Sequence, residues 1–171
     1  MMTVKRGLRV LSLVMGALLL GSACTLRQDV AFRVEEQYVT TAQFTAALES
    51  CSRVLGMSQS RIRADIFAFM LEGILFDKLA DDLGVAYGED EQLAYLQQTN
   101  AAAMADDPTC RPVGLGAVAF QFMAMEVDSD ALMSAIASLD IEINPRYGSW
   151  DKESLQLGEG GSLSQLDPSR R

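Results

Sequence analysis

The segment that most constrains the fold is a long apolar run in the middle of the chain. Its spacing predicts a helix over about residues 58–83, and within residues 66–76 only Glu72 and Gly73 interrupt the apolar positions. A helix that is apolar around its whole circumference is either central in a bundle or carries a face for a partner. The sequence therefore predicts a bundle built around this helix and leaves both roles open.

Shorter amphipathic segments surround this central helix. Thr40 and Gln43 have capping-box spacing, and Gly56 is placed to end the same helix in a left-handed cap. Asp107-Pro108 breaks a later helix, and Pro112 is expected to keep the following residues irregular. Apolar spacing predicts four flanking helices, at about 40–55, 88–105, 113–126 and 129–139.

Two short strands are predicted at the ends of this helical region. Residues 30–34 alternate between core-forming and other side chains, and Ile141 and Ile143 alternate with polar neighbours. Two isolated strands are not stable separately, so we expect them to pair. The predicted fold is mainly α, with about four to five helices and the two strands paired at the base. This domain spans residues 30–150, and the Gly/Ser-rich residues 151–171 are expected to form a disordered polar tail.

The first residues have the pattern of an export signal. A basic start precedes an apolar run of twelve residues, Val10–Gly21, which is too short for a stable membrane span of about 20 residues. Small residues and Cys24 follow, and they resemble a bacterial lipobox, in which the cysteine becomes the lipidated first residue. We expect a signal peptide at 1–23 and a tether at 24–29, which places the domain outside the cell membrane. Plain cleavage after Ala23, giving a secreted protein, is the alternative.

Charge and composition exclude several classes of function. The chain has a formal net charge of −9 and no histidine. Loss of residues 1–23 removes three basic residues, leaving 11 basic and 23 acidic residues and a net charge of −12. An acidic chain is a poor ligand for nucleic acid phosphates. Without histidine there is no His-based acid–base catalysis or His-ligated metal site, so we expect no enzyme, no metal and no cofactor.

Two cysteines remain if Cys24 carries lipid. Cys51 and Cys110 would then share an oxidising compartment with no competing thiol, which predicts a disulfide. Two separate thiols are the alternative. The spacing is unlike a redox C-x-x-C pair, and two cysteines alone make a poor zinc site.

Three stretches resemble the SurA-type family of chaperone domains, in the form found in actinobacterial extracytoplasmic lipoproteins. They are VAFRVEEQYVTTAQFTAAL, IRADIFAFMLEGILFDKLADDLGVAYGEDE and the closing IEINPRYGSWD. The residues that carry the closing match are Asn144, Pro145, Arg146, Tyr147, Gly148, Trp150 and Asp151. A turn that ends the strand is an alternative explanation of the same residues.

The resemblance implies binding of unfolded or partly folded exported chains. Some members carry a parvulin-type isomerase domain, but only a short tail follows Asp151 here, so we do not expect that activity. The expected function is a membrane-tethered holdase, and the alternative is an assembly lipoprotein that binds one folded envelope protein. The candidate client-binding residues are the large apolar side chains of two helices: Phe67, Phe69, Met70, Phe76, Phe120 and Met123.

Overall fold

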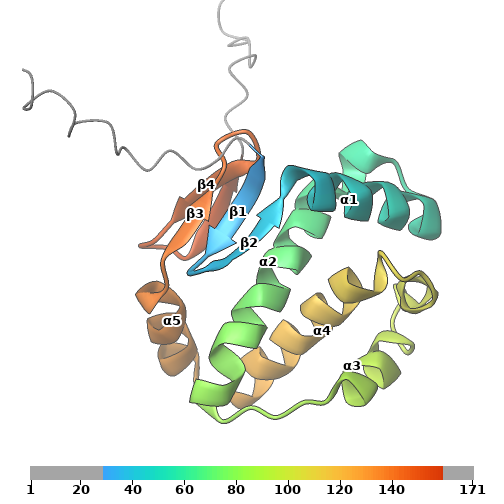
Figure 1. Cartoon of the computed structure of the whole chain (residues 1–171). Coiled ribbons are helices and arrows are strands. Elements are labelled where there is room, and N and C mark those ends of the chain that lie inside the picture. The colour runs from blue at the N-terminus through green and yellow to red at the C-terminus, as the bar shows by residue number, and fades with distance from the viewer. Residues whose placement is uncertain (1–28, 160–171) are drawn as a thin grey trace, which may run out of the picture.

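The computed structural model describes residues 29–159 and is mostly helical (Figure 1). The expectations for the signal peptide and for Cys24 fall outside these residues. The elements in chain order are β1 (Val30–Val34), β2 (Gln37–Thr40), α1 (Thr41–Leu55), α2 (Gln59–Leu83), α3 (Glu89–Leu96), the 3₁₀ helix η1 (Ala102–Asp106), α4 (Arg111–Glu126), α5 (Ser129–Ser138), β3 (Ile141–Ile143), β4 (Gly148–Asp151) and β5 (Gln156–Glu159).

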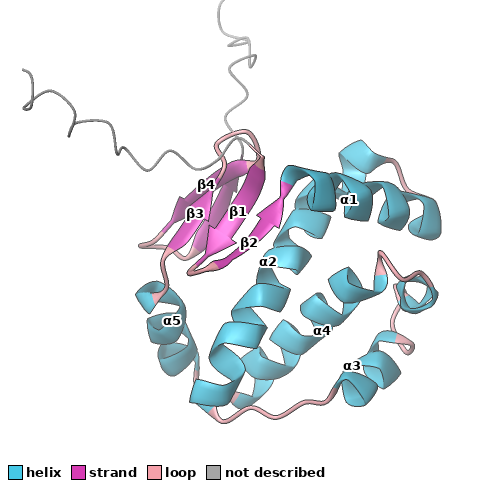
Figure 2. Ribbon diagram, in the orientation of Figure 1, coloured by secondary structure: helices cyan, strands magenta, loops and turns pink. Residues whose placement is uncertain are grey.

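Helix α2 is the centre of the molecule, and the strands gather at one end of it (Figure 2). Its buried side chains include Ile66, Leu71 and Leu75, so the helix is apolar because neighbours surround it. The structure confirms a mainly α fold of four to five helices with short strands at its base. It also favours a central role for α2 over a helix with a fully open face.

The most extensive contact between two elements joins α2 to α4. A Cβ atom on Gly116 would lie 2.8 Å from the carbonyl oxygen of Phe69 and 2.9 Å from the Cα atom of Gly73. Real side chains do not fit at such distances, so the two helix backbones meet where neither has a side chain. This crossing sets the distance between α2 and α4.

The two predicted strands do pair. β1 lies between β2 and β3 and is antiparallel to both, with Phe32 opposite Ile143. Arg33 reinforces this pairing because its guanidinium lies 2.7 Å from Asp140 and 3.2 Å from Glu142. The two carboxylates raise the pKa of Arg33 above its ordinary value, so the charge stays on the guanidinium.

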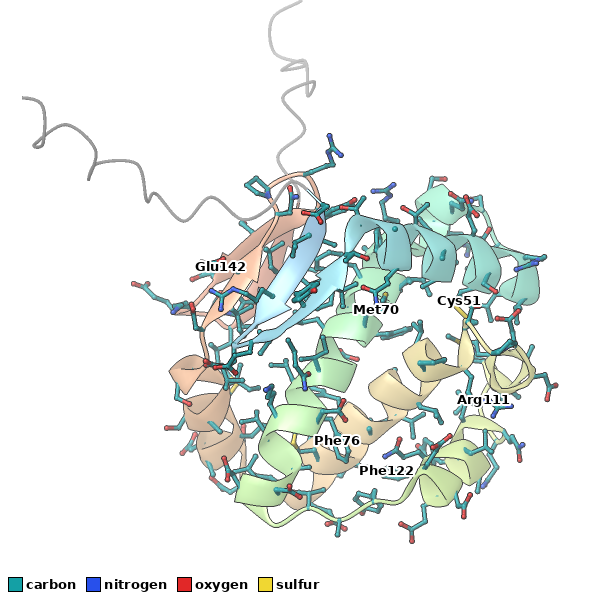
Figure 3. All side chains as sticks on the ribbon, in the orientation of Figure 1. Cys51, Met70, Phe76, Arg111, Phe122 and Glu142 are labelled. Atoms are coloured by element: carbon teal, nitrogen blue, oxygen red, sulfur yellow. A yellow bond between two sulfur atoms is a disulfide. The ribbon has the colours of Figure 1, made fainter. Side chains whose placement is uncertain are left out.

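The predicted disulfide between Cys51 and Cys110 is present, with Cα atoms 5.1 Å apart and both residues fully buried. It links α1 to the residue that precedes α4, and Figure 3 draws it beside the label of Cys51. Asp107 orders the same connection: its carboxylate accepts hydrogen bonds from the Ser50 hydroxyl at 2.7 Å and the Cys110 amide at 2.9 Å. These bonds lower the pKa of Asp107.

Two helix boundaries differ from the prediction. The helix expected at 88–105 ends at Leu96. It ends there because the Thr99 hydroxyl donates a hydrogen bond to the Leu96 carbonyl at 2.8 Å and accepts one from the Ala101 amide at 3.1 Å. Only the short η1 follows. Pro112 does not keep its segment irregular; it lies in the first turn of α4, where no intrahelical N–H bond is needed.

The expectation of a disordered tail from residue 151 is wrong for residues 151–159. β4 and β5 form an antiparallel hairpin with Trp150 opposite Leu157. The Asp151 carboxylate holds the turn by accepting bonds from the Glu153 amide at 2.9 Å and the Ser154 hydroxyl at 2.6 Å. Trp150 and Leu157 also pack against the core, which supplies the apolar burial that composition alone did not indicate.

The close helix crossing can be tested with Gly116→Ala. In an ordinary helix this change stabilises by about 1 kcal/mol. Here we expect it to lower the free energy of unfolding by about 1–3 kcal/mol, because the new methyl group meets rigid backbone. Urea unfolding followed by circular dichroism measures the change.

Gly114→Ala is the matched control in the same helix. Its methyl group would meet mainly the movable end of the Leu96 side chain, so its cost should be smaller. A stabilised Gly116→Ala protein would contradict the described crossing.

Candidate functional site

A groove of about 760 Å³ lies between α1, α2 and α4, and residues at the start of α3 also line it. Volumes of this size are typical of ligand sites. We call it the central groove. Its lining is mainly apolar: Val39, Ala46, Ala47, Met70, Gly73, Ile74, Phe76, Pro108, Pro112, Val113, Leu115, Gly116 and Ala119.

The helix crossing makes the floor of this groove. Gly73 and Gly116, which allow the close helix contact, both line it. Met70 and Ile74 border the same space from α2 and are only partly buried. Figure 3 labels Met70 and Phe76 on α2, beside α4. An apolar, partly open surface therefore lies where the two helices come closest.

Acidic groups supply the charge of the central groove. Asp77 and Glu89 line it, together with uncharged polar residues, and its lining includes no lysine or arginine. Partial burial raises the pKa of Asp77 above its ordinary value. The groove therefore presents an apolar interior with negative charge at its polar positions.

An aromatic cluster positions one wall of the groove. The Tyr87 ring stacks on Phe122 with centroids 4.3 Å apart, and Tyr95 meets Phe122 edge-on at 4.8 Å. The Tyr87 hydroxyl donates a hydrogen bond to the Glu126 carboxylate, which raises the pKa of Tyr87. The segment before α3 is thereby attached to α4.

A smaller pocket of about 360 Å³ lies on another side of α2 and α4. Phe69 and Phe120 line it with Glu72, which has no ion-pair partner within residues 29–159. Desolvation raises the pKa of Glu72 from 4.5 to about 7. A carboxyl group that is half neutral near pH 7 makes this pocket more apolar in mildly acidic conditions.

The six candidate client-binding residues do not form one surface. Met70 and Phe76 line the central groove, and Phe69 and Phe120 line the Glu72 pocket. Two expectations need correction. Met123 is 0 % exposed within the core. Phe67 is 2 % exposed and packs 4.9 Å from Phe32, so its ring serves mainly to join the sheet to α2.

Residues 144–147 connect β3 to β4 as a turn, and Gly148 and Trp150 lie in β4. The Asn144 side chain donates a hydrogen bond to the Val30 carbonyl at 2.9 Å and accepts one from the Arg146 amide at 3.1 Å. Pro145 and Arg146 are exposed in this turn. Gly148 is buried at the start of β4, where a Cβ atom would lie 2.8 Å from the Gly158 carbonyl oxygen. The geometry thus accounts for the motif as a structural turn.

The residues that make the groove were not predicted from the sequence. Gly73 and Gly116 were the available signal, since small residues inside apolar helices often mark close helix contact. Within residues 29–159 no group of three or more acidic or cysteine side chains is arranged to hold a metal ion. In the same range no helix is both long and apolar enough to cross a bilayer.

Comparisons with protein-family models, curated proteins and solved structures found no match.

The Glu72 pocket yields a pH-dependent prediction. The pKa of Glu72 is higher in the folded than in the unfolded chain, so folding loses stability as pH rises from about 4.5 to 7. Glu72→Gln removes this loss. At pH 8 the variant should be more stable than the parent by about 1–2 kcal/mol, a value reduced for partial solvent exposure. At pH 4 the two should be nearly equal.

Urea unfolding at several pH values measures this difference. Exposed Glu49→Gln, on α1, is the control for removing one negative charge. A difference between Glu72→Gln and the parent that does not change with pH would contradict the effect of desolvation.

Proposed function

We propose that the protein is a membrane-tethered holdase that binds unfolded or partly folded exported polypeptides in the central groove, without catalysis. The observation that carries the proposal is the groove itself: about 760 Å³, mainly apolar, and floored by two glycines. Unfolded chains expose apolar side chains that folded proteins bury. A partly open apolar groove offers such side chains a place away from water.

The chemistry of the lining suits varied clients. Met70 has a flexible, polarizable side chain at the groove, and such side chains adapt to apolar surfaces of different shape. The partly buried Ile74 and Leu115 add apolar contact area. Binding would depend on area and shape rather than on one catalytic group, which supports low specificity.

Charge further defines the clients. Because Asp77 and Glu89 are the charged residues of the groove, lysine or arginine next to an apolar client segment gains a favourable partner. Acidic segments would be repelled, both locally and by a chain whose net charge is −9. We therefore propose apolar segments flanked by basic residues as the preferred clients. Lipid on Cys24, the expectation from the lipobox, would hold the groove near newly exported chains.

An aggregation assay tests the proposal. The chain from residue 25 onward should suppress aggregation of thermally unfolded citrate synthase at equimolar amounts, a substrate that needs no reductant and so leaves Cys51–Cys110 intact. Met70→Glu places a charge in the groove and should abolish most of the suppression. Light scattering follows aggregation.

Met125→Glu is the matched control, since Met125 is 61 % exposed on α4 and does not line the groove. It should retain full suppression. Absence of suppression by the parent chain at equimolar amounts or above, or full suppression by a folded Met70→Glu protein, would overturn the proposal.

A further inference from the structure

A second pocket, with a different chemistry, lies where α1, α2 and the β4–β5 hairpin meet. Its volume is about 320 Å³, and it shares no lining residue with the central groove. Phe44, Phe67 and Tyr147 supply aromatic lining, and Leu157 adds an aliphatic wall. Tyr147 stacks on Phe67 with centroids 5.8 Å apart and meets Phe44 edge-on at 5.1 Å, so the aromatic surface is fixed by mutual packing.

Arg63 places a positive charge against this aromatic surface. Its Cζ atom lies 5.7 Å from the centroid of the Phe44 ring and 5.9 Å from that of Tyr147, within the range of cation–π attraction. A cation–π contact uses none of the N–H donors, so the guanidinium of Arg63 can still donate them to an acceptor such as a carboxylate.

Arg146 is the second cation of the pocket. Its position follows from the turn, because its backbone amide donates to the Asn144 side chain at 3.1 Å. Across residues 29–159, neither Arg63 nor Arg146 has a side-chain hydrogen bond or an ion pair with a carboxylate. The pocket is therefore a positively charged site on a chain whose net charge is −9.

The pocket also borders a strand that can accept a peptide. Leu157 and Gly158 of β5 line it, and β5 pairs only with β4 in the described chain. The other edge of such a strand offers backbone donors and acceptors to an extended peptide. A ligand with a backbone, an apolar side chain and a carboxylate therefore matches all three parts of the pocket.

We propose that this pocket binds the free C-terminal carboxylate of a polypeptide that ends in an apolar residue. The carboxylate accepts hydrogen bonds from Arg63 and Arg146, and the terminal side chain packs against the partly exposed Tyr147 and Leu157. This site is separate from the central groove, so it does not depend on the holdase proposal. It would give the protein a way to recognise chain ends.

Isothermal titration of the full chain in mild detergent micelles tests the proposal, with empty micelles as the blank. The ligand is the peptide Gly-Ser-Gly-Ser-Leu with a free C-terminus. The first control is the same peptide with a C-terminal amide, which lacks the carboxylate. The second control is amidated Gly-Ser-Glu-Ser-Leu, in which the carboxylate lies on an internal side chain. We expect the free acid to bind at least about tenfold more tightly than either amidated peptide, a loss typical of charge-assisted hydrogen bonds.

Three arginine variants assign the effect to the pocket. Arg63→Gln and Arg146→Gln should each weaken binding of the free acid about tenfold and leave the amide unchanged. Arg61→Gln is the matched control: it removes the same charge from an exposed position of α2 that does not line the pocket. It should bind like the parent. If Arg63→Gln does not fold, Arg146→Gln, at an exposed position, tests the proposal on its own.

Equal binding of acid and amide would overturn the proposal, as would absence of binding by the free acid. Equal binding of the peptide with the internal Glu would show recognition of acidic side chains instead of chain ends. Equal weakening by Arg61→Gln would show a general charge effect. Each of these outcomes is independent of aggregation suppression by the central groove.

Discussion

The close approach of α2 and α4 at Gly73 and Gly116 is the constraint on which the structure depends. Because a Cβ atom on Gly116 would lie 2.8 Å from the backbone of Phe69, the two helices reach this distance only with glycine there. The crossing buries the apolar middle of α2 against α4. Both glycines also line the central groove, which lies over the crossing. The same helix contact is thus part of both the core and the candidate site.

Two connections between distant parts of the described chain stabilise this arrangement from outside. β3 returns to pair with β1, and Arg33 joins the two strands through Asp140 and Glu142. The disulfide between Cys51 and Cys110 fixes the segment before α4 to α1. These connections hold α1 beside the crossing, where it forms one wall of the groove. They also bring Phe44 and Tyr147 together at the separate, basic pocket.

Local signals made much of the fold predictable. The capping box of Thr40 and Gln43, the left-handed Gly56 and the disulfide all follow from short-range pattern or cysteine count, and all are present. The predictions failed where a distant contact decides the outcome. Leu157 gains burial by lying opposite Trp150 and packing against the core, and local composition does not indicate either contact, so a polar tail was expected where β5 forms. The groove was likewise not predictable, because apolar periodicity does not state which side chains remain uncovered: Met70 borders open space, whereas Met123 is fully buried.

We propose that unfolded chains bind in the groove over the Gly73–Gly116 crossing. Site-specific photocrosslinking tests it most directly, with p-benzoylphenylalanine placed at position 74 in the groove or at position 125, which is 61 % exposed in the parent chain. After illumination with an unfolded client, we expect crosslinked product from position 74 and little from position 125. Equal crosslinking from both positions, or crosslinking from position 125 alone, would contradict it.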